Sequence, residues 1–326
     1  MGVKDTVTIR YLRQKDVFAD AFNYLIYNGK KVISPDQLEE LDTREVDVPY
    51  GGEDGAKQPV QKTRDVIKTL RAMTDGHAAY LVLAIEAQSN IHYAMAVKNM
   101  VYDALQYAKQ VEESVASHRV SGDYKNVGSD EYLSGFMKQD RLMPVVTLVI
   151  YFDSKKWDGP RTIHEMFSVQ DEELLSYVPD YKINLIEPAM MKKEDFDKFS
   201  TTLKEVLTFI KYSKDADGLK EALDADPNFH HLGREEVDVL NACVNADLHL
   251  SESEATIDVC EAIRVLNQRA ADEAAEKATE NAEKKRITTL VDNINNLKKN
   301  MGWTSEKAME ILGLSESDRK AAAPFL

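Results

Sequence analysis

Three polar residues in the first third of the sequence have the types and spacing to hold a metal ion and a water molecule. Asp65 begins one predicted strand, Glu86 ends the next strand, and Gln88 follows two residues later. In an antiparallel pair the start of one strand lies beside the end of its partner, so we expect both carboxylates at one end of a sheet. Mg²⁺ prefers oxygen ligands and keeps several of its waters, so two carboxylates can be sufficient. The pattern predicts that Asp65 and Glu86 bind Mg²⁺, with Mn²⁺ as the other candidate.

Such a site suits the hydrolysis of a phosphodiester. That reaction needs a metal that bridges the phosphate, an activated water, and stabilisation of the charge that builds on the phosphate oxygens. Gln88 shares one face of the strand with Glu86, so it is expected to lie on the same side of the sheet. Glu86 also ends an apolar run, where an ionised group is costly unless something binds it. The other interpretation is that Asp65 and Glu86 cap strand ends and face water, because D-x(20)-E-x-Q is a weak pattern.

The helix expected after this strand adds candidate substrate-binding residues. Lys98, Tyr102 and Gln106 recur every four residues, which aligns them on one helix face. A basic group and a phenol placed in this way can reach a phosphate near the metal, so Lys98 and Tyr102 are predicted to contact substrate. His92 lies in the turn before the helix and is expected to be within reach of the site. An ordinary solvated helix face is the alternative.

The elements that must position these residues are predicted from hydrophobic periodicity. Helices are expected over 17–27 and 96–114, strands over 45–50, 64–70, 77–88 and 144–152, and an exposed loop over 117–135. Because helices and strands alternate irregularly along the chain, the predicted fold class is α/β (α+β mixed), with helices packed on a central sheet.

The second half of the chain is predicted to be mostly helical. An apolar seam recurs at helical spacing near the end, at Ile287, Leu290, Val291, Ile294, Leu297 and Met301. We expect this seam to be buried, either on the body of the protein or against a second copy in a homodimer. The predicted division is a core over 1–190, a helical extension packed on it over 191–265, and a long helix followed by short helices over 266–326.

Composition and charge limit the classes of function. The 326 residues carry a formal net charge of −15, so binding to DNA would need a local basic surface or bound cations. No apolar run is long enough to span a membrane and no secretory signal is visible, which predicts a cytoplasmic protein with no membrane partner. Cys243 and Cys260 are expected to be buried free thiols, and the pair His230-His231 has no partners at metal-ligand spacing in the sequence.

Several blocks of the sequence resemble one known family. They are DVFADAFNYLIYNGKKVISPDQLEELDTREVDVPYG, RDVIK, AYLVLAIEAQSNIHYAMAVKNMVYDALQYAKQVE, PVVTLVIYFDSKKWDGPRTIHEM and VPDYKINLIEP. Over roughly residues 15–265 the chain resembles the recombination-promoting nuclease / putative transposase family of bacteria, which is placed in the PD-(D/E)XK superfamily.

The resemblance implies a restriction-endonuclease-like core sheet flanked by helices, a helical C-terminal region, and DNA cleavage with Mg²⁺. By position, Asp65 and Glu86 match the motif carboxylates, and Lys98 and Tyr102 match the basic and tyrosine positions of the next helix. Gln88 stands where the superfamily usually has lysine. A glutamine can position the water but carries no charge, so the metal and Lys98 are expected to stabilise the transition state. We therefore expect a Mg²⁺-dependent DNA endonuclease. The alternative is a catalytically inactive nuclease fold that acts as an interaction or regulatory module.

Overall fold

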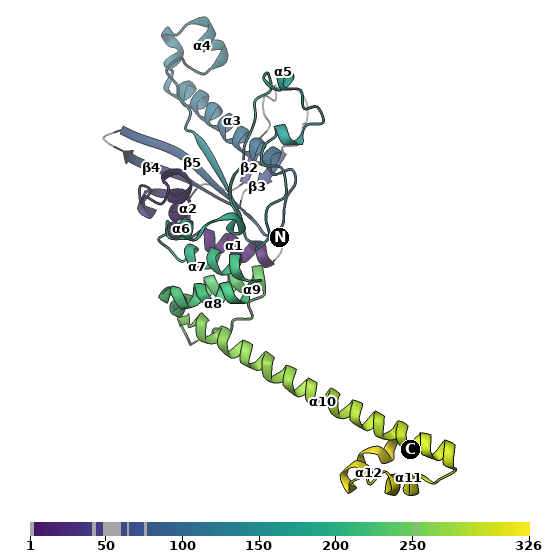
Figure 1. Ribbon diagram of the computed structural model, residues 1–326. Coiled ribbons are helices and arrows are strands. Elements are labelled where there is room, and N and C mark those ends of the chain that lie inside the picture. Colours follow the sequence, from purple (N-terminus) through teal and green to yellow (C-terminus); the bar gives the residue numbers. More distant parts are fainter. Residues whose placement is uncertain (1–2, 41–43, 48–59, 64, 75–76, 252) are drawn as a thin grey trace. The chain divides into compact units, whose positions relative to one another are not determined.

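The computed structural model describes residues 3–40, 44–47, 60–63, 65–74, 77–251 and 253–326 (Figure 1). The chain divides into two compact units, Met1–Cys260 and Glu261–Leu326. No helix among the described residues is long and apolar enough to cross a membrane. The expected boundary near residue 190 stays a prediction.

A five-stranded sheet forms the centre of the first unit. Its strands lie in the order β1 (Leu38–Glu40), β4 (Val66–Thr74), β5 (His77–Gln88), β6 (Val145–Tyr151) and β7 (Asn184–Ile186). The first three pair antiparallel, whereas β5, β6 and β7 pair parallel. Two short ribbons stand apart from it: β2 (Arg44–Asp47) with β3 (Val60–Thr63), and β8 (Leu232–Gly233) with β9 (Thr256–Ile257). The predicted mixed α/β class is confirmed.

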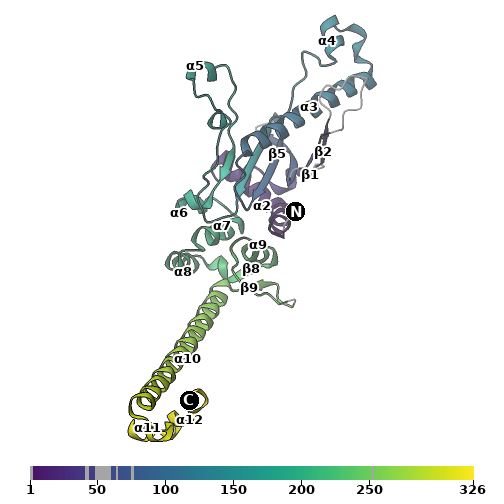
Figure 2. The same ribbon diagram turned by 90° about the vertical axis from the view of Figure 1, so that its right-hand side faces the viewer.

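Helices pack on both faces of this sheet (Figure 2). The helices of the first unit are α1 (Val3–Leu12), α2 (Lys15–Tyr27), α3 (Met95–Ser121), α4 (Ser129–Ser134), α5 (Glu172–Leu175), α6 (Lys193–Phe196), α7 (Leu203–Tyr212), α8 (Ala216–Ala225) and α9 (Arg234–Val244). Along β5 and β6 the side chains alternate between faces, so Ala84 and Glu86 share a face with Thr147 and Val149. That face lies under α3, since Asp103 of α3 accepts a hydrogen bond from the Thr147 hydroxyl at 2.5 Å.

The strands β1, β3 and β7 were not predicted, and the helices of the first 135 residues differ from the predicted ones in two places. The helix α1 was not expected, because its residues VKDTVTIRYL show little one-sided apolar patterning. The helix expected to end at residue 114 continues to Ser121, so the expected loop over 117–135 holds the end of α3 and all of α4. The His118 ring holds this end of α3 by bonding to Asp123 and Asp140. Residues 48–50 of the expected strand over 45–50 lie outside the described residues.

The second unit contains most of the long helix α10 (Val259–Met301), together with α11 (Ser305–Ile311) and α12 (Glu316–Ala322). Ile294, Ala308 and Ala322 are fully buried in a small core, with Val291 and Leu297 packed against it. The predicted seam therefore packs on the chain's own last two helices. Its burial is incomplete, because Met301 at its end is 59% exposed.

Candidate active site at the edge of the sheet

The register of β4 against β5 brings the two predicted carboxylates to one end of the sheet. Val66 pairs with Ile85, so Asp65, which directly precedes β4, comes level with Glu86. The N–H of Ala87 donates to Asp65 Oδ2 at 2.9 Å and fixes the orientation of that carboxylate. The antiparallel arrangement predicted from the sequence is confirmed.

Glu86 is fully buried and is paired with a cation. Because Glu86 faces α3, its Oε2 accepts a hydrogen bond from Lys98 Nζ on that helix at 2.6 Å. A buried carboxylate is tolerated when an opposite charge and hydrogen bonds compensate for lost hydration. Glu86 therefore does not cap a strand end in water, and the solvent-facing interpretation is wrong for this residue.

The surroundings of Lys98 keep it charged. Burial by itself lowers the pKa of Lys98, but the charge of Glu86 and the hydrogen bond to it more than reverse this effect, so the pKa is raised. The Tyr102 ring lies 5.6 Å from Lys98 Nζ, a distance that suits a cation–π contact. Tyr102 is only 6% exposed and Gln106 is also buried, so this helix face is not an ordinary solvated one. Direct contact of Tyr102 with substrate stays a prediction.

A third carboxylate influences Asp65. Burial raises the pKa of Asp65, and the charge of Asp5 adds to this effect, while the Ala87 N–H and the Lys98 ammonium lower it; the net pKa is raised. Asp5 lies on α1, which is why the sequence analysis missed it. The donors at this edge, Asp65 and Glu86, are both carboxylates, a ligand type that suits a hard divalent cation such as Mg²⁺, and Asp5 adds negative charge from α1.

The other two predicted site residues lie at the same edge. Gln88 follows Glu86 on its face of β5, and its carbonyl accepts from the Phe152 N–H at 2.8 Å. His92 is exposed in the turn before α3. Lys98 bonds to Glu86 and its charge acts on Asp65, whereas Gln88 and His92 lie near these residues along the chain.

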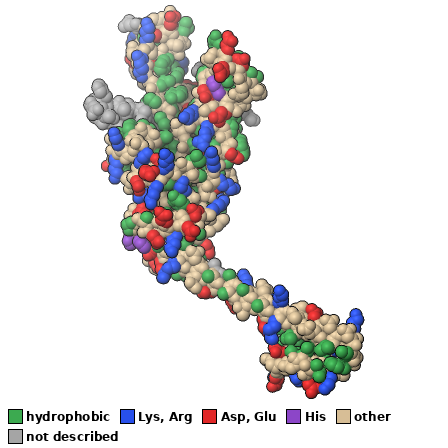
Figure 3. Space-filling model, in the orientation of Figure 1, with side chains coloured by type: hydrophobic (Ala, Val, Ile, Leu, Met, Phe, Trp, Pro, Cys, Tyr) green, Lys and Arg blue, Asp and Glu red, His purple; other side chains and the backbone are tan. Residues whose placement is uncertain are grey.

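The loop that follows β6 carries basic residues that the sequence analysis did not single out. Because β5 and β6 are parallel, this loop begins at the edge where Glu86 lies. Lys155 and Lys156 are exposed on it, and the buried Trp157 anchors it through an N–H bond to Glu187 Oε1 at 2.5 Å. On the face of Met1–Cys260 in Figure 3, Lys and Arg side chains are interspersed with Asp and Glu. Lys155 and Lys156 place two exposed ammonium groups on this loop, which also carries Asp153 and Asp158.

A second group of metal-ligating residue types lies elsewhere in the described part of the chain. His230, Asp258 and Cys260 each offer one ligand atom, and these atoms lie within 4.8 Å of one another. In the sequence His230 has no partner at metal-ligand spacing, whereas the fold brings it beside Asp258, 28 residues away, and Cys260. Sequence spacing alone carries no signal for such a group.

Comparison with known proteins finds one match. Residues 61–229 match the family described as putative transposase, YhgA-like. The matched range includes Asp65, Glu86, Lys98 and the loop after β6, and it ends one residue before His230. Neither the curated proteins nor the solved structures give a match.

Proposed function

Since this chain belongs to the family of YhgA-like putative transposases, we propose that it is a Mg²⁺-dependent DNA endonuclease, with Mn²⁺ as an alternative ion. One observation carries the proposal. Asp65 and Glu86 converge at the end of the β4–β5 pair, and a charged lysine bonds to the buried member of the pair. A sheet that is flanked by α2 and α3 and carries these residues is the arrangement expected of a PD-(D/E)XK core.

In this proposal Asp65 and Glu86 would hold the ion, which supplies a Lewis acid and lowers the pKa of a bound water. The Ala87 N–H keeps Asp65 turned toward the site. Gln88, one step beyond on the same face, can both accept and donate hydrogen bonds, so it is assigned the task of orienting the attacking water. Lys98 is assigned to the charge that develops on the phosphate.

In this proposal Lys98 can bond to either of two groups, the Glu86 carboxylate or a phosphate oxygen of the substrate. Without a divalent cation its ammonium compensates for the buried charge of Glu86. A cation bound at Glu86 would take over that compensation, so the ammonium would become available to a phosphate oxygen. The proposal therefore links metal binding to substrate binding, and we expect Mg²⁺ to bind weakly alone and more tightly with DNA.

The second candidate function is an inactive nuclease fold that serves as an interaction module. Gln88 in place of lysine and the net charge of −15 favour it. A nicking assay on supercoiled plasmid separates the two functions, with Mg²⁺, Mn²⁺ or chelator, and with Glu86→Gln as the inactive reference. Metal-dependent nicking that Glu86→Gln abolishes supports the nuclease. Absence of nicking in both metals, with the protein folded and still able to bind DNA, supports the module.

A further inference from the structure

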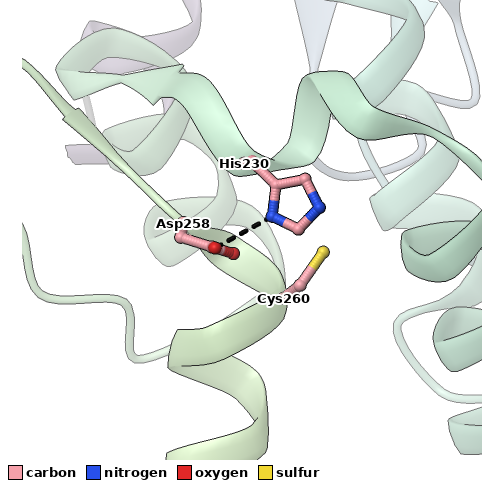
Figure 4. Close-up of side chains that lie close together, drawn as sticks. All are labelled: His230, Asp258 and Cys260. Carbon is pink, nitrogen blue, oxygen red and sulfur yellow. Dashed lines mark hydrogen bonds and ion pairs between the residues drawn. The ribbon is translucent and has the colours of Figure 1, made fainter.

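Three side chains at the end of the first unit form a compact group with mixed donor atoms (Figure 4). His230 Nδ1 lies 2.8 Å from Asp258 Oδ2, and the sulfur of Cys260 lies beside the same imidazole ring. One ligand atom from each of the three lies within 4.8 Å of the others. A nitrogen, an oxygen and a sulfur donor thus lie close together.

The fold holds the backbones of these residues in place. Phe229 next to His230, and Val259 between Asp258 and Cys260, are fully buried. The antiparallel pairing of Leu232 with Ile257 brings the end of the 3₁₀ helix η5 (Pro227–His231) beside the residues that follow β9. A site whose backbones are anchored on both sides needs little rearrangement to bind a ligand.

The donor set selects a class of metal. Thiolate and imidazole favour borderline and soft transition metals such as Zn²⁺, whereas Mg²⁺ requires oxygen ligands. Zinc–ligand bonds of ~2.0–2.3 Å place the ligand atoms of a tetrahedral site about 3.3–3.8 Å apart. The separation of His230 Nδ1 from Asp258 Oδ2, 2.8 Å, is shorter than that value and the other separations are at most 4.8 Å, so the side chains must rotate to bind an ion. His230 and Asp258 are 46% and 44% exposed, which leaves room for a solvent ligand.

We propose that His230, Asp258 and Cys260 bind one zinc-class transition-metal ion, which fastens the first turn of α10 to η5. Such an ion joins segments that are 28 residues apart in sequence, so it stabilises the folded chain by mass action. The site uses no residue of the proposed nuclease centre, and it would stand even if the nuclease proposal failed.

A purely hydrogen-bonded cluster is the competing explanation. The ion pair of His230 with Asp258 and the weak bond from Cys260 Sγ to the Leu223 carbonyl, at 3.6 Å, need no metal. Burial raises the pKa of the Cys260 thiol, so a metal must displace its proton to bind. The two explanations differ in whether a metal–sulfur bond forms, and that bond can be observed directly.

The test uses the full-length protein, freed of metal by chelator and titrated with Co²⁺, which reports thiolate ligation through a charge-transfer absorption band. We expect one equivalent of Co²⁺ to produce the band and one equivalent of Zn²⁺ to displace it. Cys260→Ser and His230→Asn should lose or strongly weaken it. Cys243→Ser and His231→Asn are matched controls that should keep it.

Melting temperatures supply a second measurement that does not depend on absorption. Zn²⁺ should raise the melting temperature of the wild type and of Cys243→Ser, and it should leave Cys260→Ser unchanged. Glu86→Gln should keep the cobalt band, which separates this site from the sheet edge. A titration without a charge-transfer band, or a band of equal strength in Cys260→Ser, would overturn the proposal.

Discussion

The two candidate metal sites of this chain differ in how their charges are arranged. At the sheet edge the carboxylates are oxygen donors, and the buried Glu86 is held by Lys98. At the start of α10 the donors are nitrogen, oxygen and sulfur, and the histidine and the aspartate are each about half exposed. The first site therefore suits a hard divalent cation and substrate phosphate, whereas the second suits one transition-metal ion. From this comparison we expect donor type and charge balance to separate two metals within one chain.

The largest expected effect concerns cleavage. Glu86→Gln and Asp65→Asn should each lower the rate of Mg²⁺-dependent plasmid nicking by about a thousandfold or more, because the amides are poor ligands for the ion. His230→Asn and Cys260→Ser should leave the rate nearly unchanged. Asp36→Asn, an exposed carboxylate far along the chain from both sites, controls for net charge. Equal losses of nicking rate in the sheet-edge variants and in the His230 and Cys260 variants would contradict the assignment of cleavage to the sheet edge.

The next effect is on stability without metal, and here the two carboxylates should diverge. If Asp65 and Glu86 only repelled each other, neutralising either one would not lower the stability of the fold. Glu86 differs because it is paired with Lys98. Glu86→Gln leaves a partly buried ammonium without its partner and should lower the free energy of unfolding by about 3 kcal/mol. Asp65→Asn should not destabilise the protein. Urea unfolding in chelator measures both, and the pair Glu86→Gln with Lys98→Met should recover part of the loss.

Lys98→Ala tests the link between the metal and the ammonium. We expect nicking to fall about a hundredfold, as when one group that stabilises transition-state charge is removed. The sequence alone suggests unchanged metal affinity, but the observed bond to Glu86 predicts tighter Mg²⁺ binding, since the metal no longer competes with the ammonium. Lys109→Ala on the exposed side of α3 is the matched control. Calorimetry that shows weaker Mg²⁺ binding in Lys98→Ala would contradict the idea that Mg²⁺ replaces the Lys98 ammonium at Glu86.

A smaller effect is expected from the loop after β6. Changing Lys155 and Lys156 together to alanine should weaken DNA binding about tenfold at low salt. The slope of log affinity against log salt concentration should fall by the amount expected for the loss of about one to two phosphate contacts. The change of Lys284 and Lys285 to alanine removes the same charge from the exposed surface of α10. If both double variants bind DNA equally well, the loop does not contact it.

The smallest effect is a pH dependence that belongs to Asp65. Its raised pKa means that the folded state holds the proton more tightly than the unfolded state. The stability linked to this proton is present below about pH 4 and is lost as the pH rises through the raised folded-state pKa. In chelator, Asp65→Asn should therefore melt a few degrees above the wild type near pH 7, and the difference should shrink toward pH 4. A constant difference would place its cause outside this ionisation.

The sequence by itself determined the main elements and the pair of carboxylates. Apolar runs bounded by polar residues identify β5 and β6, because buried strands exclude charge, and a glutamate at the end of such a run stands out for the same reason. Two strands separated by only two residues of sequence can pair only antiparallel, so the approach of Asp65 to Glu86 was predictable.

Only the tertiary structure decided which groups balance these charges. Lys98 was visible as a basic residue on a helix, but its bond to Glu86 depends on how α3 crosses the sheet. Asp5 lies on α1, a helix with almost no one-sided apolar pattern. The apolar seam of α10 packs on the last two helices of the same chain. His230, Asp258 and Cys260 meet because a two-residue strand pair brings distant segments together. Periodicity reports the burial of each segment, whereas contacts between distant segments are set by packing, which leaves no local pattern in the sequence.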